Sequence, residues 1–204
     1  MNALKTAALA AAAFVLTTGA SAQTTTSPAE VRAGTYKLDP NHGKITWAVT
    51  HFGLSTYIGQ FAHVEATLKA DPKTPAASAV EVTVDTNSVG TLNAELDKQL
   101  KGKAFLDVAS FPTATFKSTK VTKTGANTAD IAGDLTLHGV TKPVVVHAVF
   151  NRGGPNPMDK RYQLGFAGSA EINRSDFGIK TYLPNLGDKV TLTIEAEFAL
   201  VAGA

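Results

Sequence analysis

The residues that could carry acid–base or metal chemistry are few and scattered. The chain has no cysteine, and its histidines never fall at the His-x-His or His-x-x-x-His spacings that place two ligands side by side. The sequence contains no Gly-x-Ser-x-Gly elbow, His-Glu-x-x-His helix or glycine-rich phosphate loop. It therefore predicts no catalytic residues, no metal site and no cofactor. The five histidines are His42, His51, His63, His138 and His147.

One group of residues has the composition of a catalytic triad. Asp134, Thr136 and His138 alternate along one predicted strand, so their side chains share a face. A triad also requires a nucleophile that is oriented by its base, and this spacing does not supply that geometry. A solvated strand face that ends in a turn histidine explains the pattern better.

A second group lies in the predicted loop Asn173–Gly178, which reads Asn-Arg-Ser-Asp-Phe-Gly. The planar guanidinium of Arg174 suits an anionic head group such as phosphate. The same arginine could instead pair with Asp176 and, with the turn-forming Asn and Asp residues, fix the loop. The sequence is compatible with both interpretations.

The elements that must position these groups are mainly strands. Apolar residues alternate with polar ones through Ile131–Leu137. The predicted strand Lys142–Phe150 follows, and its β-branched and apolar run Val144–Phe150, broken only by His147, is typical of a strand covered on both faces. His138 and Gly139 join the two strands into a predicted hairpin. Further strands are predicted at Thr35–Leu38, Lys44–His51, Ile58–Leu68, Val80–Val84, Ala114–Val121, Tyr162–Ile172 and Val190–Phe198.

The pattern changes once, in Leu92–Lys101, where leucines recur every four residues. This spacing predicts an amphipathic helix that ends at Gly102. Asn151–Lys160 is rich in glycine and proline and is predicted to be a loop. Eight or nine one-sided strands in consecutive order must close their edges, as a barrel or as a sandwich.

Aromatic residues come from many of the strands, and the strands also carry numerous glycine and alanine residues. The aromatic residues would fill a solid core. The small residues would leave space for one slender apolar ligand, and an eight-stranded barrel is wide enough for either arrangement. The pattern alone does not decide between them.

The first 22 residues have the features of a secretory signal peptide. One lysine precedes the apolar run Thr6–Leu16, which is too short to cross a bilayer, and Ala20-Ser21-Ala22 is a small-x-small cleavage site. Removing them takes one lysine from a chain of formal charge +2, leaving +1. Such a weak charge predicts no nucleic-acid partner. We expect a periplasmic protein without stable membrane insertion, with a flexible leader at 23–34 and a single domain at 35–204.

Several segments, taken in order, identify a resemblance. Tyr36–Gly53, Phe105–Asp107, Phe111–Phe116, Gly133–Pro143 and Ile172–Gly178 together resemble the YceI-like family of bacterial exported proteins. The resemblance implies an all-β fold, an eight-stranded antiparallel lipocalin-like barrel with one inserted α-helix. It also implies a binding protein, not an enzyme, whose lumen holds a polyisoprenoid lipid such as an isoprenoid quinone or a prenyl phosphate. A homodimer is common in the family, and the residues neither support nor oppose it.

By analogy with the family, two sets of ligand-binding residues are predicted. Trp47, Val49, Phe61, Phe116, Leu135 and Phe166 would contact the isoprenoid chain. His51, Asp107, Asn173 and Arg174 would surround the head group at the barrel mouth. Gln99 stands where many members carry histidine, so the preferred head group can differ. Two alternatives remain: an enzyme that uses an acid–base pair such as His51 with Asp107, and a structural module with a solid barrel.

Overall fold

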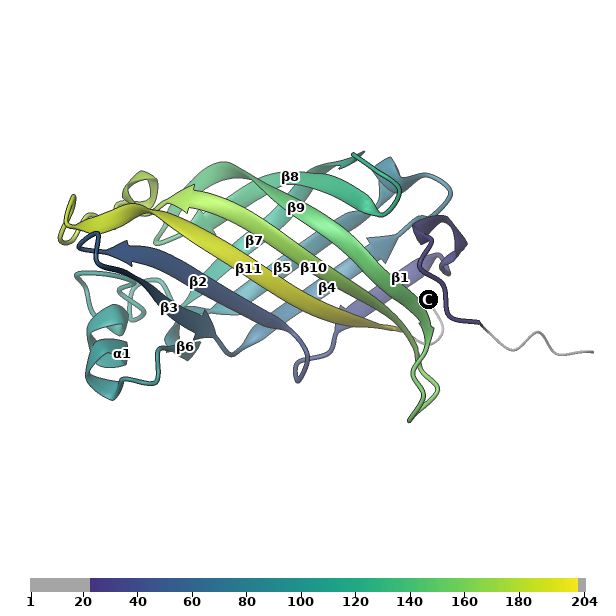
Figure 1. The fold of residues 1–204 in the computed structure, drawn as a ribbon, viewed down its shortest axis with the longest axis horizontal. Coiled ribbons are helices and arrows are strands. Elements are labelled where there is room, and N and C mark those ends of the chain that lie inside the picture. Colours follow the sequence, from purple (N-terminus) through teal and green to yellow (C-terminus); the bar gives the residue numbers. More distant parts are fainter. Residues whose placement is uncertain (1–22, 202–204) are drawn as a thin grey trace, which may run out of the picture.

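The computed structural model describes residues 23–201, and the predicted signal peptide at 1–22 lies outside them. Within these residues, eleven strand segments form one continuous sheet with a single α-helix beside it (Figure 1). The strand segments are β1 Gly34–Leu38, β2 Lys44–His51, β3 Ser55–Phe61, β4 Val64–Ala70, β5 Ala79–Asp85, β6 Val89–Gly90, β7 Thr113–Lys123, β8 Thr128–Leu137, β9 Val140–Pro155, β10 Tyr162–Asn173 and β11 Leu186–Leu200. The α-helix is α1, Ala94–Lys101, and the 3₁₀ turns are η1 Pro28–Glu30, η2 Pro75–Ala77, η3 Thr86–Ser88 and η4 Arg174–Phe177.

These segments make eight strands because three strands are each broken once. β1 and β2 both run along β11, with Leu38 opposite Phe198 and Lys44 opposite Glu195. In the same way β4 continues β3, and β6 continues β5. The pairing of β1 with β11 closes the sheet. The predicted eight-stranded antiparallel barrel with one helix is therefore confirmed.

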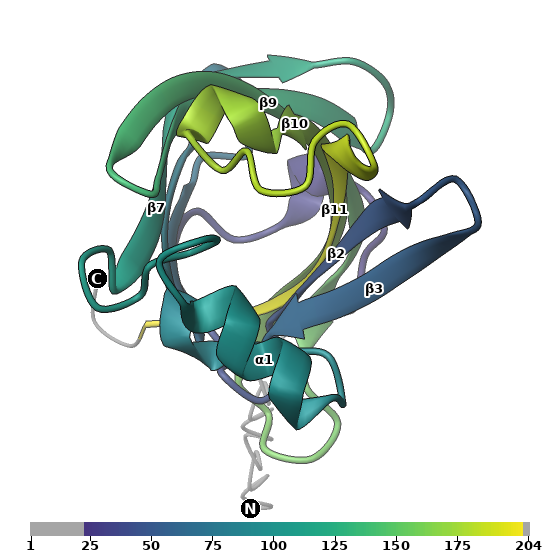
Figure 2. The ribbon, with the colours of Figure 1, turned by 90° about the vertical axis from the view of Figure 1, so that its left-hand side faces the viewer.

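The three breaks are neighbours in the sheet, at 39–43, 62–63 and 86–88. The N–H of Ala62 donates to the carbonyl of Ser88, and the N–H of Asp85 donates to that of His63, so the regular ladder stops there. The prediction of one strand over Ile58–Leu68 is therefore wrong. Beyond the breaks, the β2–β3 hairpin projects from the barrel wall, and α1 lies beside it (Figure 2).

The β8–β9 hairpin forms as predicted. His138 and Gly139 both have positive φ, 51° and 74°, as a two-residue type I′ turn requires. The prediction that the second strand is covered on both faces is wrong, because Val145 and Val149 are 42% and 37% exposed on the outer wall. β9 is also longer than expected, because its residues 152–155 pair with β10 after a bulge at Asn151, so the predicted loop shrinks to its second half.

The helix is shorter than predicted at its N-terminus. Asn93 is the N-cap, and its side-chain oxygen accepts from the N–H of Leu96 at 3.2 Å. Leu92 has φ 64° and is fully exposed, so it does not belong to the apolar face. The predicted end at Gly102 is confirmed. Within residues 23–201 no helix is long and apolar enough to cross a membrane.

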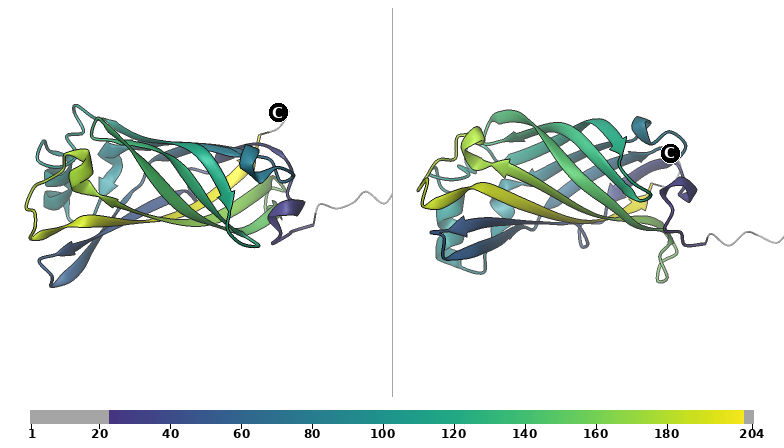
Figure 3. Two further views of the ribbon diagram at one scale, coloured as in Figure 1. Left: turned by 90° about the horizontal axis from the view of Figure 1, so that it is seen from above. Right: turned by 45° about the horizontal axis from the view of Figure 1, so that its top comes forward.

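The two ends of the barrel differ (Figure 3). At one end, here called the α1 end, lie α1, the β2–β3 turn and the loop 178–185. At the other, the N-terminal end, η1 lies near the C-terminus of the described chain. Residues 23–33 of the predicted leader 23–34 lie on this end: Thr25 forms a bridge with Gly153, and Arg32 stacks 4.5 Å above the ring of Tyr162.

Candidate functional site

The barrel encloses a cavity of about 320 Å³, here called the lumen. Inward side chains of nearly every strand form its wall, and that wall is almost entirely apolar. Leu100, Phe105 and Leu106, from α1 and the residues after it, border the lumen at the α1 end. Because few polar groups face the cavity, the lumen suits a hydrocarbon chain better than a polar substrate.

Aromatic side chains lie flat against the wall because glycines leave room for them. The indole of Trp47 covers Gly59 on the paired strand β3, and the ring of Phe116 covers Gly133 on β8. A Cβ atom on either glycine would collide with the ring. Each aromatic–glycine pair therefore keeps a large apolar surface on the wall and leaves the centre of the barrel empty.

All six predicted chain-contacting residues face this space. Trp47, Val49, Phe61, Phe116, Leu135 and Phe166 line the lumen, and they come from five different strands. Strand periodicity agrees with the inward positions of Trp47, Val49 and Leu135, because inward positions alternate along a strand. Phe61 was predicted from the family resemblance alone, since unbroken alternation through Ile58–Leu68 would place it on the face of His63. Their contact with a ligand stays a prediction.

The four predicted head-group residues are not brought together. Only Arg174 lines the lumen. His51 ends β2 with its ring 4.4 Å from that of Phe52. Asp107 lies in the loop after α1, with φ 42°, and Asn173 is exposed, its side-chain amide 3.5 Å from the carboxylate of Asp176.

Arg174 is buried, with 5% of its surface exposed, and its guanidinium binds the protein's own backbone. Nε donates to the carbonyl of Gly187 at 2.8 Å, Nη1 to Ile179 at 3.0 Å and Nη2 to Leu186 at 2.8 Å. Burial lowers the pKa of Arg174, and the nearby carboxylate of Asp188 opposes that shift. These contacts favour the structural interpretation of Arg174, which fixes the loop between η4 and β11.

The same loop is held by a second set of contacts. The carboxylate of Asp188 accepts from the N–H of Ser175 at 2.8 Å and from its hydroxyl at 2.6 Å. The hydrogen bonds from Ser175 hold the pKa of Asp188 below its usual value, and the Arg174 charge adds to this effect. The expected Arg174–Asp176 pair is replaced by Ser175–Asp188, a partner that sequence spacing did not indicate.

Two loops meet across the α1 end. The hydroxyl of Thr181 donates to the carbonyl of Ala104, and the rings of Phe105 and Tyr182 lie 6.2 Å apart. The N–H of Phe52, at the β2–β3 turn, donates to the carbonyl of Asn185 at 2.9 Å. Sequence periodicity did not predict these contacts at the α1 end, because they are made by loop residues.

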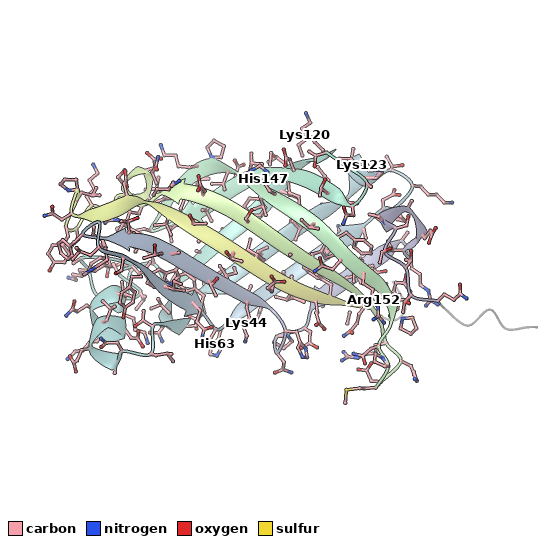
Figure 4. All side chains as sticks on the ribbon, in the orientation of Figure 1. Lys44, His63, Lys120, Lys123, His147 and Arg152 are labelled. Atoms are coloured by element: carbon pink, nitrogen blue, oxygen red, sulfur yellow. The ribbon has the colours of Figure 1, made fainter. Side chains whose placement is uncertain are left out.

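The other candidate polar groups make separate contacts. The Nδ1 of His138 lies 3.1 Å from the carbonyl of Phe177, and Thr136 bonds to Thr141, so no hydrogen bond joins the predicted triad-like group. His63 and His147 lie on the outer surface (Figure 4), near Asp85 and Asp130 respectively. Among the described residues no cluster of His, Asp or Glu could hold a metal ion.

A closed, up-and-down β-barrel around an apolar cavity defines a class of small-ligand-binding barrels. The model of the YceI-like domain matches residues 36–198, and the chain belongs to this family. It is 43% identical to the UPF0312 protein of Pseudomonas syringae pv. tomato, over 76% of this chain and 81% of that protein. It is 42% identical to the UPF0312 protein of Pseudomonas aeruginosa strain LESB58, over 82% of this chain and 88% of that protein.

Solved structures share the fold. The YceI protein of Campylobacter jejuni aligns with TM-score 0.67 and 29% identity, over 74% of this chain and 90% of that one. Burkholderia cenocepacia BcnA aligns with TM-score 0.70 and 24% identity, over 78% and 98%. A polyisoprenoid binding domain from Saccharophagus degradans aligns with TM-score 0.65 and 13% identity, over 83% and 100%.

Proposed function

We propose that this protein binds a polyisoprenoid lipid in the lumen of its barrel. The observation that carries the proposal is the almost wholly apolar cavity of about 320 Å³, which lies inside a barrel of the YceI-like family. The name of the Saccharophagus degradans domain, which shares this fold, supports the same class of ligand.

The binding free energy would come mainly from burial of the chain. Each CH₂ group moved from water into an apolar site contributes about 0.8 kcal/mol. The rings of Trp47, Phe116 and Phe166 would supply much of the contact area, and Val49, Phe61 and Leu135 would complete it. The branched, flexible chain of a polyisoprenoid suits a wall of rings and branched aliphatic side chains.

The head group would lie at the α1 end. An isoprenoid quinone or a prenyl phosphate has one polar end, and the loops that carry Thr181, Asn185 and Asp107 offer polar groups there. Arg174 places a positive charge beside the lumen at this end, although its guanidinium is engaged by backbone carbonyls. The isoprenoid chain would therefore supply most of the affinity, and the loops at the α1 end would orient the head group.

A carrier or storage role in the periplasm fits these features. It rests on the signal-peptide pattern of residues 1–22 and on a cavity that would shield an insoluble chain from water. The cavity argues against a solid structural barrel. An enzyme that uses His51 with Asp107 gains no support, because no hydrogen bond or ion pair joins the two among residues 23–201.

Native mass spectrometry tests the proposal directly. The protein is exported to the periplasm, purified without denaturation, weighed intact, and extracted with organic solvent. A bound mass that matches an isoprenoid quinone or a prenyl phosphate is the expected result and identifies the head group. A protein that is empty and also fails to take up added isoprenoids would remove the proposed function and leave the fold unchanged.

A further inference from the structure

A second cavity of about 200 Å³ lies toward the N-terminal end of the barrel. Pro28, Ala29 and Val31 of the N-terminal segment form part of its wall. Most of its lining is apolar, and Asp71, Ser78 and Asn127 of the β4–β5 and β7–β8 turns add a few polar groups.

Five side chains line both this cavity and the lumen. They are Leu68, Val80, Ile131, Ala148 and Phe166, and each comes from a different strand. All five are partly accessible, although their strand positions point them into the barrel. These five side chains border empty space on both sides and are here called the partition. The two cavities are therefore separated by side chains and not by backbone.

Phe166 is the largest member of the partition, and it is held in place. Its ring packs edge to face against Phe150 at 5.4 Å and against Phe198 at 6.1 Å. Phe150 is itself fixed, because its N–H donates to the carbonyl of Asn127 and its carbonyl accepts from the side-chain amide of that residue. The β-bulge at Asn151 falls directly beside the Phe150–Phe166 pair.

Ala148 lies across from Gly168 on the neighbouring strand, two residues along from Phe166. Both positions carry almost no side chain, so neither fills the space beside the Phe166 ring. A larger residue at position 148 would occupy the space next to the ring.

We propose that Phe166, with Ala148 beside it, sets the length of the isoprenoid chain that the barrel accepts. This inference rests on the proposed function. A chain that enters from the α1 end fills the lumen and stops at the Phe166 ring, and the second cavity is the room that a longer chain would occupy if the ring were absent. Isoprene units beyond the stop stay in water and add no affinity.

The test is a series of isoprenoid quinones that share one head group and differ only in the number of isoprene units. Binding to the natural protein should tighten with each added unit up to a limit and then stay constant. In Phe166→Ala the limit should move to longer chains, and the first quinone beyond the natural limit should bind at least about tenfold tighter than it does to the natural protein. In Ala148→Leu the limit should move to shorter chains.

Phe116→Ala is the matched control, because Phe116 lines the lumen but not the second cavity. It should change affinity for every quinone without moving the limit. Ala148→Leu removes no packing, so it keeps the test valid if Phe166→Ala does not fold. An unchanged limit in both partition variants that still bind quinones would overturn this inference alone. Failure of every quinone to bind the folded natural protein would overturn the proposed function itself.

Discussion

The indole of Trp47 lies flat on Gly59, its partner on the adjacent strand, and occupies the space that a Cβ atom of residue 59 would need. This relationship keeps the indole against the wall of the lumen. It also gives the protein a built-in probe, because Trp47 is the only tryptophan in the chain.

Gly59→Ala should push the indole away from the wall and into the lumen. We expect a loss of about 1–3 kcal/mol in the free energy of unfolding, as for an overpacked core, and weaker binding of isoprenoids. Gly90→Ala is the control, because a Cβ there meets nothing within 4 Å. Urea denaturation and the fluorescence of Trp47 report both effects. Equal stability and affinity in the two variants would show that the Trp47–Gly59 contact does not shape the lumen.

Arg174→Lys should destabilise the fold even though the charge is kept. A lysine ammonium is a point donor and cannot satisfy the three carbonyls of Ile179, Leu186 and Gly187 that the planar guanidinium reaches. Leaving buried carbonyls unpaired should cost about 3 kcal/mol in the free energy of unfolding. Lys180→Ala, on the exposed side of the same loop, should change stability little. A wild-type urea midpoint for Arg174→Lys would refute the loop-anchor role.

The same loop should make the fold sensitive to acid. The pKa of Asp188 is lowered in the folded state. Near the ordinary pKa of aspartate, the folded protein therefore binds fewer protons than the unfolded chain. The contribution of ionised Asp188 to the free energy of unfolding is fully present above the ordinary aspartate pKa of about 3.9. It is lost as the pH falls through the pKa of Asp188 in the folded state. Asp188→Asn should therefore lose less stability than the natural protein as the pH falls below about 3.9. Asp176→Asn removes one charge from the same loop and is the control, and an identical pH dependence in all three proteins would contradict this account.

The strands were predictable because inward and outward residues alternate, as in β10 and β11, whose predicted bounds differ from the observed ones by a few residues only at the ends. The break at Ala62–His63 was not predictable. It depends on Ser88, a residue far along the chain, whose carbonyl and hydroxyl bind the two backbone N–H groups there. The alternation of residues through Ile58–Leu68 does not depend on Ser88 and so could not indicate the break.

The candidate site divides in the same way. Residues of the lumen wall such as Val49 and Leu135 follow from periodicity and from the family resemblance, because a strand position fixes the direction of the side chain. The loop residues do not follow, because the partner of Arg174 is a set of backbone carbonyls that any sequence would supply. The partition at Phe166 could not be predicted from the sequence either. The sequence pattern of an inward aromatic residue is the same whether its side chain fills a core or separates two cavities.

The N-terminal segment is tied to the barrel through Tyr36. Tyr36 is fully buried, its hydroxyl donates to the carbonyl of Arg32 at 2.7 Å, and burial raises its pKa to about 12, so the phenol stays neutral at physiological pH. Tyr36→Phe should lower the free energy of unfolding by about 1 kcal/mol and leave the Arg32 carbonyl without this donor. Because the lost bond ties residues 23–33 to the barrel, cleavage by proteases should increase within that segment. Tyr57→Phe is the control, since the Tyr57 hydroxyl makes no hydrogen bond within residues 23–201. Equal cleavage of the two variants would show that the Tyr36 hydroxyl does not hold the segment on the barrel.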